Sequence, residues 1–156
     1  IDGYCDGKEE FVRKIEKLAL SQFDGTWDKM YLAARNVQKK REISPLVEAG
    51  GVSAAILTEK GNIYVGVCID TACSLGMCAE RNAVFGAYCK GYRKEDIIGL
   101  AIVADCSPIA SPCGACRQVL SELVDLEMPI FLANKEKVEK HTIGELLPMV
   151  FIGESL

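Results

Sequence analysis

Short, continuous apolar runs constrain the fold of this chain more than any other feature. VSAAIL (52–57) and IIGLAIVA (97–104) carry no charged residue and no polar alternation, so each predicts a strand buried on both faces of a sheet. IYVGVCI (63–69) and PIFLA (129–133) predict two further strands, and the turn EKGN makes the first two strands of the chain a hairpin.

Helical segments separate these strands. Amphipathic spacing and helix-start signals predict four helices, over 8–22, 26–41, 78–90 and 111–124. Thr26 and Ser111-Pro112 have the form of helix starts, with Pro112 at the first helical position, and Pro45 to Gly51 is expected to be a loop. Thr142 and Glu145 form a capping-box pair for a last short helix. Strands alternating with helices predict a three-layer α/β domain.

Composition narrows the class of protein and of partner. The chain has 156 residues, 49% of them hydrophobic, which suits one domain with a sizeable core. No apolar run approaches the roughly 18–20 residues of a membrane span, and the N-terminus lacks a secretory pattern, so a cytoplasmic protein is expected. A net charge of −4 favours a small-molecule partner over long nucleic acid.

Eight cysteines and a single histidine define the possible metal chemistry. The cysteines are scattered through apolar segments, which indicates a reducing compartment, with buried thiols and a metal site. One histidine, His141, excludes a zinc site built mainly on imidazoles, and we assign it no role.

Two helix starts carry the candidate ligands. In SPCGACRQ (111–118), Cys113 and Cys116 are three apart and lie in the first turn, where the helix dipole stabilises thiolates. In MCAERNA (77–83), Cys78 is expected at the helix cap, so that it and Glu80 can aim at one point.

If the two helix starts face each other, Cys78, Cys113 and Cys116 supply three thiolates to one Zn²⁺ and leave a fourth position open for water. The metal would activate that water, and Glu80 would move the proton as general acid and base. Three thiolates carry more negative charge than Zn²⁺ can neutralise. We therefore expect Arg81 or Arg117 to donate a hydrogen bond to a sulfur and offset the excess charge.

Two other kinds of site compete with this interpretation. Cys113 and Cys116 could be a thioredoxin-like redox pair, because a CxxC between a strand and a helix fits that chemistry too. A purely structural zinc would need a fourth ligand, such as Cys73, Asp105 or Cys106.

The motifs CAERNA, SPCGACRQVL and GELLP resemble the small cytidine deaminases of the zinc-dependent cytidine deaminase superfamily. The resemblance implies a three-layer αβα fold with a central mixed sheet of about five strands, one Zn²⁺ per chain on Cys78, Cys113 and Cys116, and Glu80 as proton shuttle. It implies a homo-oligomer, a tetramer or a dimer. It covers roughly residues 30 to 156, so we divide the chain into an N-terminal helical extension, 1–25, and a zinc-dependent deaminase domain, 26–156.

The substrate positions of that family are altered here. Its Phe and Asn before the first strand fall on Gly50 and Ala49, and its ribose-binding Asn-x-Glu falls on Cys68-Ile69-Asp70. The resemblance implies hydrolytic deamination of a cytidine-like aminopyrimidine or nucleoside. A blasticidin S-like compound, or a catalytically silent zinc-binding module, is the alternative. The expected substrate-binding residues are Cys68, Asp70, Ala79, Ser111 and Phe151.

Overall fold

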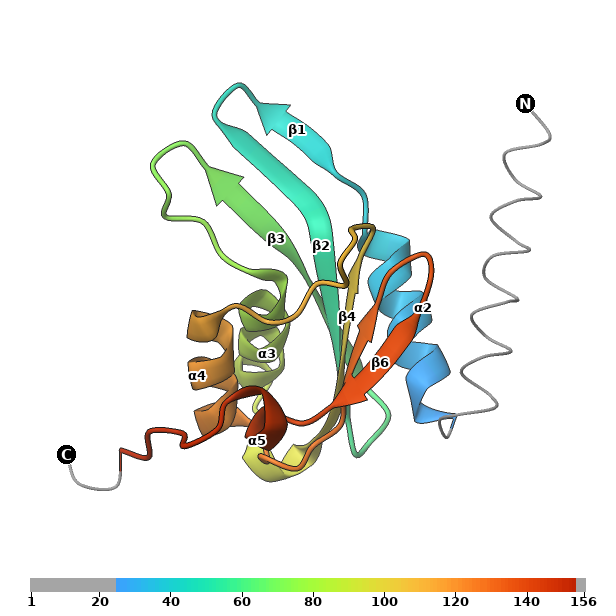
Figure 1. Cartoon of the computed structure of the whole chain (residues 1–156), viewed down its shortest axis with the longest axis vertical. Helices are drawn as coiled ribbons and strands as arrows, with labels where there is room; N and C mark the ends of the chain where they lie inside the picture. The colour runs from blue at the N-terminus through green and yellow to red at the C-terminus, as the bar shows by residue number, and fades with distance from the viewer. Residues whose placement is uncertain (1–24, 154–156) are drawn as a thin grey trace.

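A mixed sheet with helices on both faces forms the domain in the computed structural model, which describes residues 25–153 (Figure 1). The helix expected over 8–22, and with it nearly all of the expected extension 1–25, lies outside the described residues. The six described strands are β1 (Arg41–Ser44), β2 (Val47–Thr58), β3 (Ile63–Thr71), β4 (Ile97–Ala104), β5 (Ile130–Ala133) and β6 (Val138–His141).

Strand β2 organises the sheet. It pairs antiparallel with β3 along one edge, and its other edge pairs first with β1 and then, beyond a bulge, with β4. Strands β4 and β5 are parallel, and β6 returns antiparallel to β5. The sheet is therefore mixed, as the resemblance implied, and the β2–β3 hairpin expected from the EKGN turn is confirmed.

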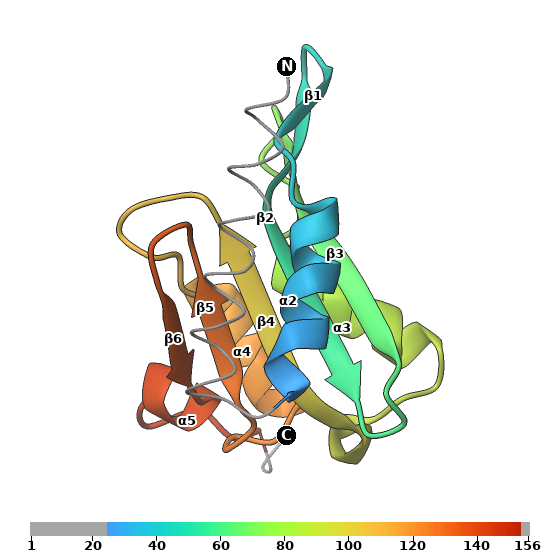
Figure 2. The ribbon, with the colours of Figure 1, turned by 90° about the vertical axis from the view of Figure 1, so that its right-hand side faces the viewer.

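The helices divide into two layers. Helix α2 (Thr26–Val37) covers one face, where Trp27, Tyr31 and Phe131 pack together. Helices α3 (Ala79–Cys89) and α4 (Gly114–Leu123) lie on the opposite face, and Figure 2 shows them behind the sheet with α2 in front of it. A short 3-10 helix (Lys94–Asp96) precedes β4, and α5 (Ile143–Leu146) follows β6.

The structure corrects the sequence-based prediction for 38–51. Helix α2 ends at Val37, not near residue 41, because Gln38 is extended and the following residues pair with β2 as strand β1. The expected loop from Pro45 to Gly51 is mostly the first part of β2, so β1 and β2 form a hairpin arm that extends beyond the core (Figure 1). Pro45 does lie in the turn between β1 and β2, but the pairing of three strands outweighs the turn signals of the two glycines.

Three other elements show how well local sequence signals predict where a helix or strand begins. The Thr142 side chain accepts from the Glu145 backbone N–H, and Glu145 reaches back to the Thr142 N–H, so the capping box is confirmed. Helix α4 begins at Gly114 with Cys113 as its cap, two residues after the predicted start, because Cys113 is still extended. The charged run KEKVEK contains most of the edge strand β6, which sequence patterning did not predict.

No helix within residues 25–153 combines the length and apolar character that crossing a membrane requires.

Candidate metal centre

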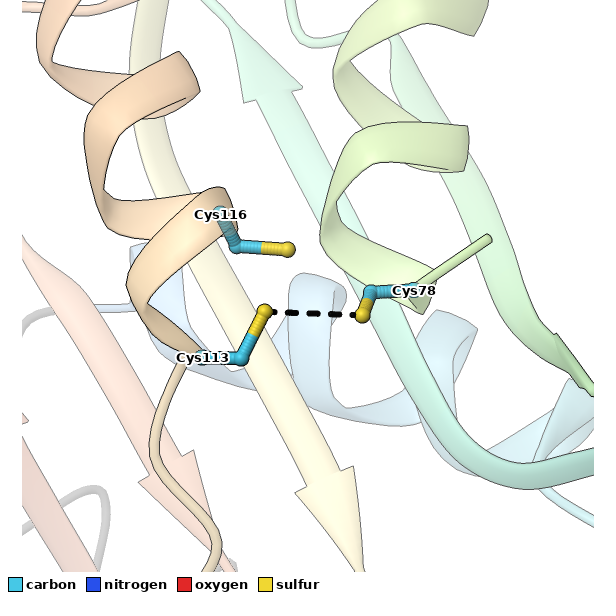
Figure 3. Close-up of side chains that lie close together, drawn as sticks. All are labelled: Cys78, Cys113 and Cys116. Atoms are coloured by element: carbon cyan, nitrogen blue, oxygen red, sulfur yellow. Dashed lines mark hydrogen bonds between the residues drawn. The ribbon is translucent and has the colours of Figure 1, made fainter. Parts of the chain in front are cut away.

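Two helix N-termini bring three cysteine thiols together on one face of the sheet. Cys78 caps α3 and Cys113 caps α4, each in extended conformation, and Cys116 lies in the first turn of α4. Their sulfurs point toward one another from the two helices, as Figure 3 shows. The two segments are joined because Gly66 of β3 lets α3 approach the sheet closely and α4 packs beside α3.

The distances between the sulfurs fit one tetrahedral ion. All three Sγ atoms lie within 4.8 Å of one another, and Cys78 Sγ is 3.6 Å from Cys113 Sγ. Two sulfurs bound to the same zinc at about 2.3 Å each would be about 3.8 Å apart. Among the described residues no fourth ligand joins this cluster.

Among the three thiols, the surrounding protein groups favour the thiolate form only at Cys113. Burial raises the pKa of Cys78 and of Cys116. Burial acts in the same direction on Cys113, but hydrogen bonds from the Cys116 backbone and the neighbouring thiols bring the pKa of Cys113 below its usual value. A divalent cation would supply the positive charge that three thiolates need here.

Arg81 places a positive charge next to one of the sulfurs. Its Nη2 lies 3.6 Å from Cys78 Sγ, a sulfur hydrogen bond that raises the pKa of the guanidinium. Its Nε is buried with no hydrogen-bond partner in the described part of the chain. Arg117 is placed differently from the expected sulfur contact, because it donates to Pro112 O, Leu146 O and Ser111 Oγ at 2.7, 2.7 and 3.0 Å.

Glu80 lies inside the protein next to this cluster. Its side chain is only 5% exposed, and burial raises the pKa of its carboxyl group. The charge of Arg81 and a contact with the Cys116 thiol act in the opposite direction. A carboxyl group that is buried but close to a positive charge can hold a proton and release it.

The residues expected to bind substrate lie in several places. Cys68 is half-buried, and its thiol accepts the Val52 backbone N–H at 3.2 Å, while Asp70 is exposed opposite Glu48 in the β2–β3 pairing. Ala79 is fully buried and belongs to the hydrophobic core. Ser111 is exposed and bonded to Arg117.

Phe151 lies apart from the sulfurs of its own chain. Its ring is 66% exposed, and its carbonyl accepts from Gln118 Nε2 at 3.3 Å. It lines a surface pocket of about 340 Å³ with the C-terminal half of α4, formed in part by Lys94, Ser121, Glu122 and Leu126.

The structure gives no support to a four-ligand structural site. Neither Cys73 nor Cys106 belongs to the cluster within residues 25–153. Asp105 is engaged by Arg35 at 2.7 Å and by Lys135 at 3.4 Å.

Sequence patterning missed one contact beside the predicted substrate positions Ala49 and Gly50. Gln38 Nε2 donates to Gly51 O at 3.1 Å, which ties α2 to the bulge of β2. The sequence offers no signal for it, because Gln38 lay within a predicted helix and Gly51 within a predicted loop.

Comparisons with known proteins agree with this site. The family model described as the cytidine and deoxycytidylate deaminase zinc-binding region matches residues 26–132. A cytidine deaminase of Sporosarcina psychrophila is 46% identical over 107 residues, covering 67% of this chain and 77% of the relative. One of Halalkalibacterium halodurans is 41% identical over 108 residues, covering 67% and 80%.

A solved structure gives the same result for the fold. The crystal structure of cytidine deaminase from Burkholderia pseudomallei matches with a TM-score of 0.71 at 32% identity, covering 80% of this chain and 98% of that chain. These matches, and a cysteine cluster suited to zinc, exclude the thioredoxin-like interpretation. The chain therefore belongs to the zinc-dependent cytidine and deoxycytidylate deaminase family.

Proposed function

We propose that this chain deaminates a cytidine-like nucleoside, cytidine or deoxycytidine, with zinc held by Cys78, Cys113 and Cys116. The observation that carries the proposal is the convergence of three thiols, 4.8 Å or less apart, beside the buried carboxyl group of Glu80. The named relatives are cytidine deaminases, which supports this substrate class.

Each residue has a defined task in the proposed reaction. When bound, zinc supplies a Lewis acid that lowers the pKa of a water molecule toward neutrality. The Glu80 carboxylate takes one proton from the attacking water and delivers it to the adjacent ring nitrogen, and it then carries the proton of the new hydroxyl group to the leaving amino group. A C–O bond forms at the ring carbon, the C–N bond breaks, and ammonia leaves. Arg81, at Cys78 Sγ, offsets the excess negative charge of the thiolates.

A different aminopyrimidine compound is the second candidate substrate. A Cβ at Gly50, the position of the family's aromatic residue, would lie 2.2 Å from Lys39 O, so backbone fills that space. The Cys68 thiol, at the family's Asn position, accepts a backbone N–H and is therefore already engaged. Both observations favour a substrate whose sugar or side group is held in another way.

Ammonia release from zinc-loaded protein distinguishes these possibilities. We expect turnover of cytidine and deoxycytidine in a panel that also contains deoxycytidylate and blasticidin S. Turnover of blasticidin S alone would favour the second candidate. No release from any compound, with one zinc per chain, would favour a binding module and contradict the proposal.

The assembly and location proposed here rest on the family resemblance and the composition. We propose a cytoplasmic homo-oligomer, a tetramer or a dimer, which light scattering of the full chain would test. A neighbouring copy could cover three exposed apolar side chains near the end of the described chain, those of Met149, Phe151 and Ile152.

A further inference from the structure

Strand β2 carries a bulge at the end of the sheet where both cysteine segments begin. The β2–β3 pairing passes from Ala49↔Ile69 to Ser53↔Val67, so the three residues from Gly50 to Val52 stand opposite Cys68 alone. On the other edge of β2, Val52 pairs with Ala104, the last residue of β4. Such bulges redirect a strand and are common next to functional sites.

The backbone on both sides of the bulge leads to the sulfurs. After Cys68, Ile69 exchanges two backbone hydrogen bonds of 2.9 Å with Met77, the residue before Cys78. After Ala104, the chain enters the loop that ends at Cys113. The bulge therefore lies at the same end of the sheet as the two segments that lead to the cysteines.

Side chains, and not strand partners, hold two backbone groups of the bulge. Gln38 Nε2 donates to Gly51 O at 3.1 Å from α2, and the Val52 N–H donates to Cys68 Sγ at 3.2 Å from β3. Gln38 is itself oriented, because its Oε1 accepts from Arg35 Nη1 at 2.8 Å. Without such partners, these partly buried backbone groups would cost free energy and leave the bulge free to move.

The bulge is also closely packed against neighbouring backbone. Gly50 has a φ of +82°, and a Cβ there would lie 2.2 Å from Lys39 O. Directly after the bulge, the fully buried Ser53 donates from Oγ to Ala34 O at 2.7 Å. The segment from Gly50 to Ser53 is thus fixed against the C-terminal end of α2 and the chain that follows it.

We infer that Gln38 and Cys68 are positioning residues, which hold the Gly50–Val52 backbone as a preformed wall of the substrate pocket. The inference rests on the proposed function. Neither residue belongs to the sulfur cluster found among residues 25–153, so they affect substrate binding and not the chemical step. If this backbone had to become ordered when substrate binds, the free-energy cost of ordering it would weaken substrate binding.

The test compares Gln38→Ala and Cys68→Ala with two controls in the full-length, zinc-loaded protein. Cys68→Ser keeps a hydrogen-bond acceptor. Tyr88→Phe removes the 2.8 Å bond to Leu123 O, at the opposite ends of α3 and α4 from the sulfurs. The two alanine variants should raise KM for cytidine by about 5- to 10-fold, the effect of one lost hydrogen bond, with kcat changed less than about twofold.

Two independent readouts accompany the kinetics. Amide hydrogen exchange of the segment 50–52 should become about tenfold faster in both alanine variants, and stay near the native rate in Cys68→Ser and Tyr88→Phe. The affinity for uridine, the deamination product of cytidine, should fall in parallel with the rise in KM, with one zinc per chain retained.

The outcomes separate this inference from the proposed function. Wild-type protein that deaminates neither cytidine nor deoxycytidine contradicts the proposed function, and uridine affinity and amide exchange then test the wall alone. An active protein whose KM and uridine affinity do not change in Gln38→Ala and Cys68→Ala overturns the inference. An equal rise in KM for Tyr88→Phe overturns it too, because a general loss of stability would then explain the effect.

Discussion

Glu80 is the only charged side chain that is buried within residues 25–153. Burying a carboxyl group is unfavourable unless neighbouring groups compensate, so its position in the first turn of α3 needs a reason. Arg81 and the Cys116 thiol lie close enough to act on its pKa, and the proton transfer that we propose for Glu80 would supply that reason. The sequence predicted this residue from its spacing to Cys78, but it could not predict the burial.

Replacing Glu80 by Gln tests its role with the least change of shape. We expect turnover to fall by about 10²- to 10⁴-fold, the usual contribution of a general acid and base, because the amide cannot carry the proton. Zinc content should stay at one per chain, since Glu80 is not a ligand. Ammonia release and metal analysis of the same sample check both parts. Near-native turnover would remove Glu80 from the mechanism.

Arg81 makes the second prediction at this scale. Arg81→Ala should weaken zinc binding by about 10- to 100-fold, the usual effect of removing a group that hydrogen-bonds a metal ligand. The measurement is competition with a chelating dye. Arg93→Ala removes the same charge from a residue that donates to Tyr92 O, so it serves as the control. Equal zinc affinity in the two variants would contradict the prediction.

Among the elements, the contact of α3 with β3 sets the position of Cys78. Gly66 permits it, because a Cβ at that residue would lie 2.3 Å from Ala79 O and 2.5 Å from Ala83 N. Asn82 strengthens the contact by donating to Val67 O at 2.8 Å. The start of α3, and with it one of the three sulfurs, is therefore placed by the backbone of a neighbouring strand.

Gly66→Ala should therefore destabilise the fold and disturb the metal site. Because the added methyl group meets backbone atoms, we expect a loss of about 1–3 kcal/mol in the free energy of unfolding, together with weaker zinc binding. Denaturant unfolding and metal titration measure the two effects. Gly86→Ala, in helix α3, is the control, since nothing lies within 4 Å of a Cβ at that residue and the change should be neutral or stabilising. Equal stability of the two variants would disprove the steric argument.

On the scale of the whole molecule, the proposed zinc links two helices whose ligands are 35 residues apart in the chain. The ion binds the folded arrangement and not the separated cysteines of the unfolded chain, so it should stabilise the domain. Zinc would therefore join α3 and α4 at their N-termini, while their C-terminal ends are joined by Tyr88 and Leu123.

Removing the metal should lower the melting temperature measurably. A ligand present at about 1,000 times its Kd contributes about 4 kcal/mol, so a chelator should shift the thermal transition down by several degrees, and added zinc should restore it. Calorimetry of the full chain measures the shift. A melting temperature unchanged by removal of all zinc would show that the ion does not couple the two helices.

The sequence by itself determined the elements and the chemistry carried by local motifs. Continuous apolar runs predicted β4 residue for residue, the capping box predicted the start of α5, and the spacing of Cys78, Glu80, Cys113 and Cys116 predicted a possible zinc site. These features depend on residues close together in the chain, so patterning can detect them.

Only the tertiary structure decided how distant segments pair. It turned the expected loop 45–51 into the hairpin arm, made an edge strand of part of KEKVEK, and placed Arg81 rather than Arg117 at a sulfur. It also brought Gln38 to Gly51 and Val52 to Cys68. The physical reason is the same in each case: hydrogen bonds between distant residues satisfied backbone and side-chain groups whose partners local propensity does not specify.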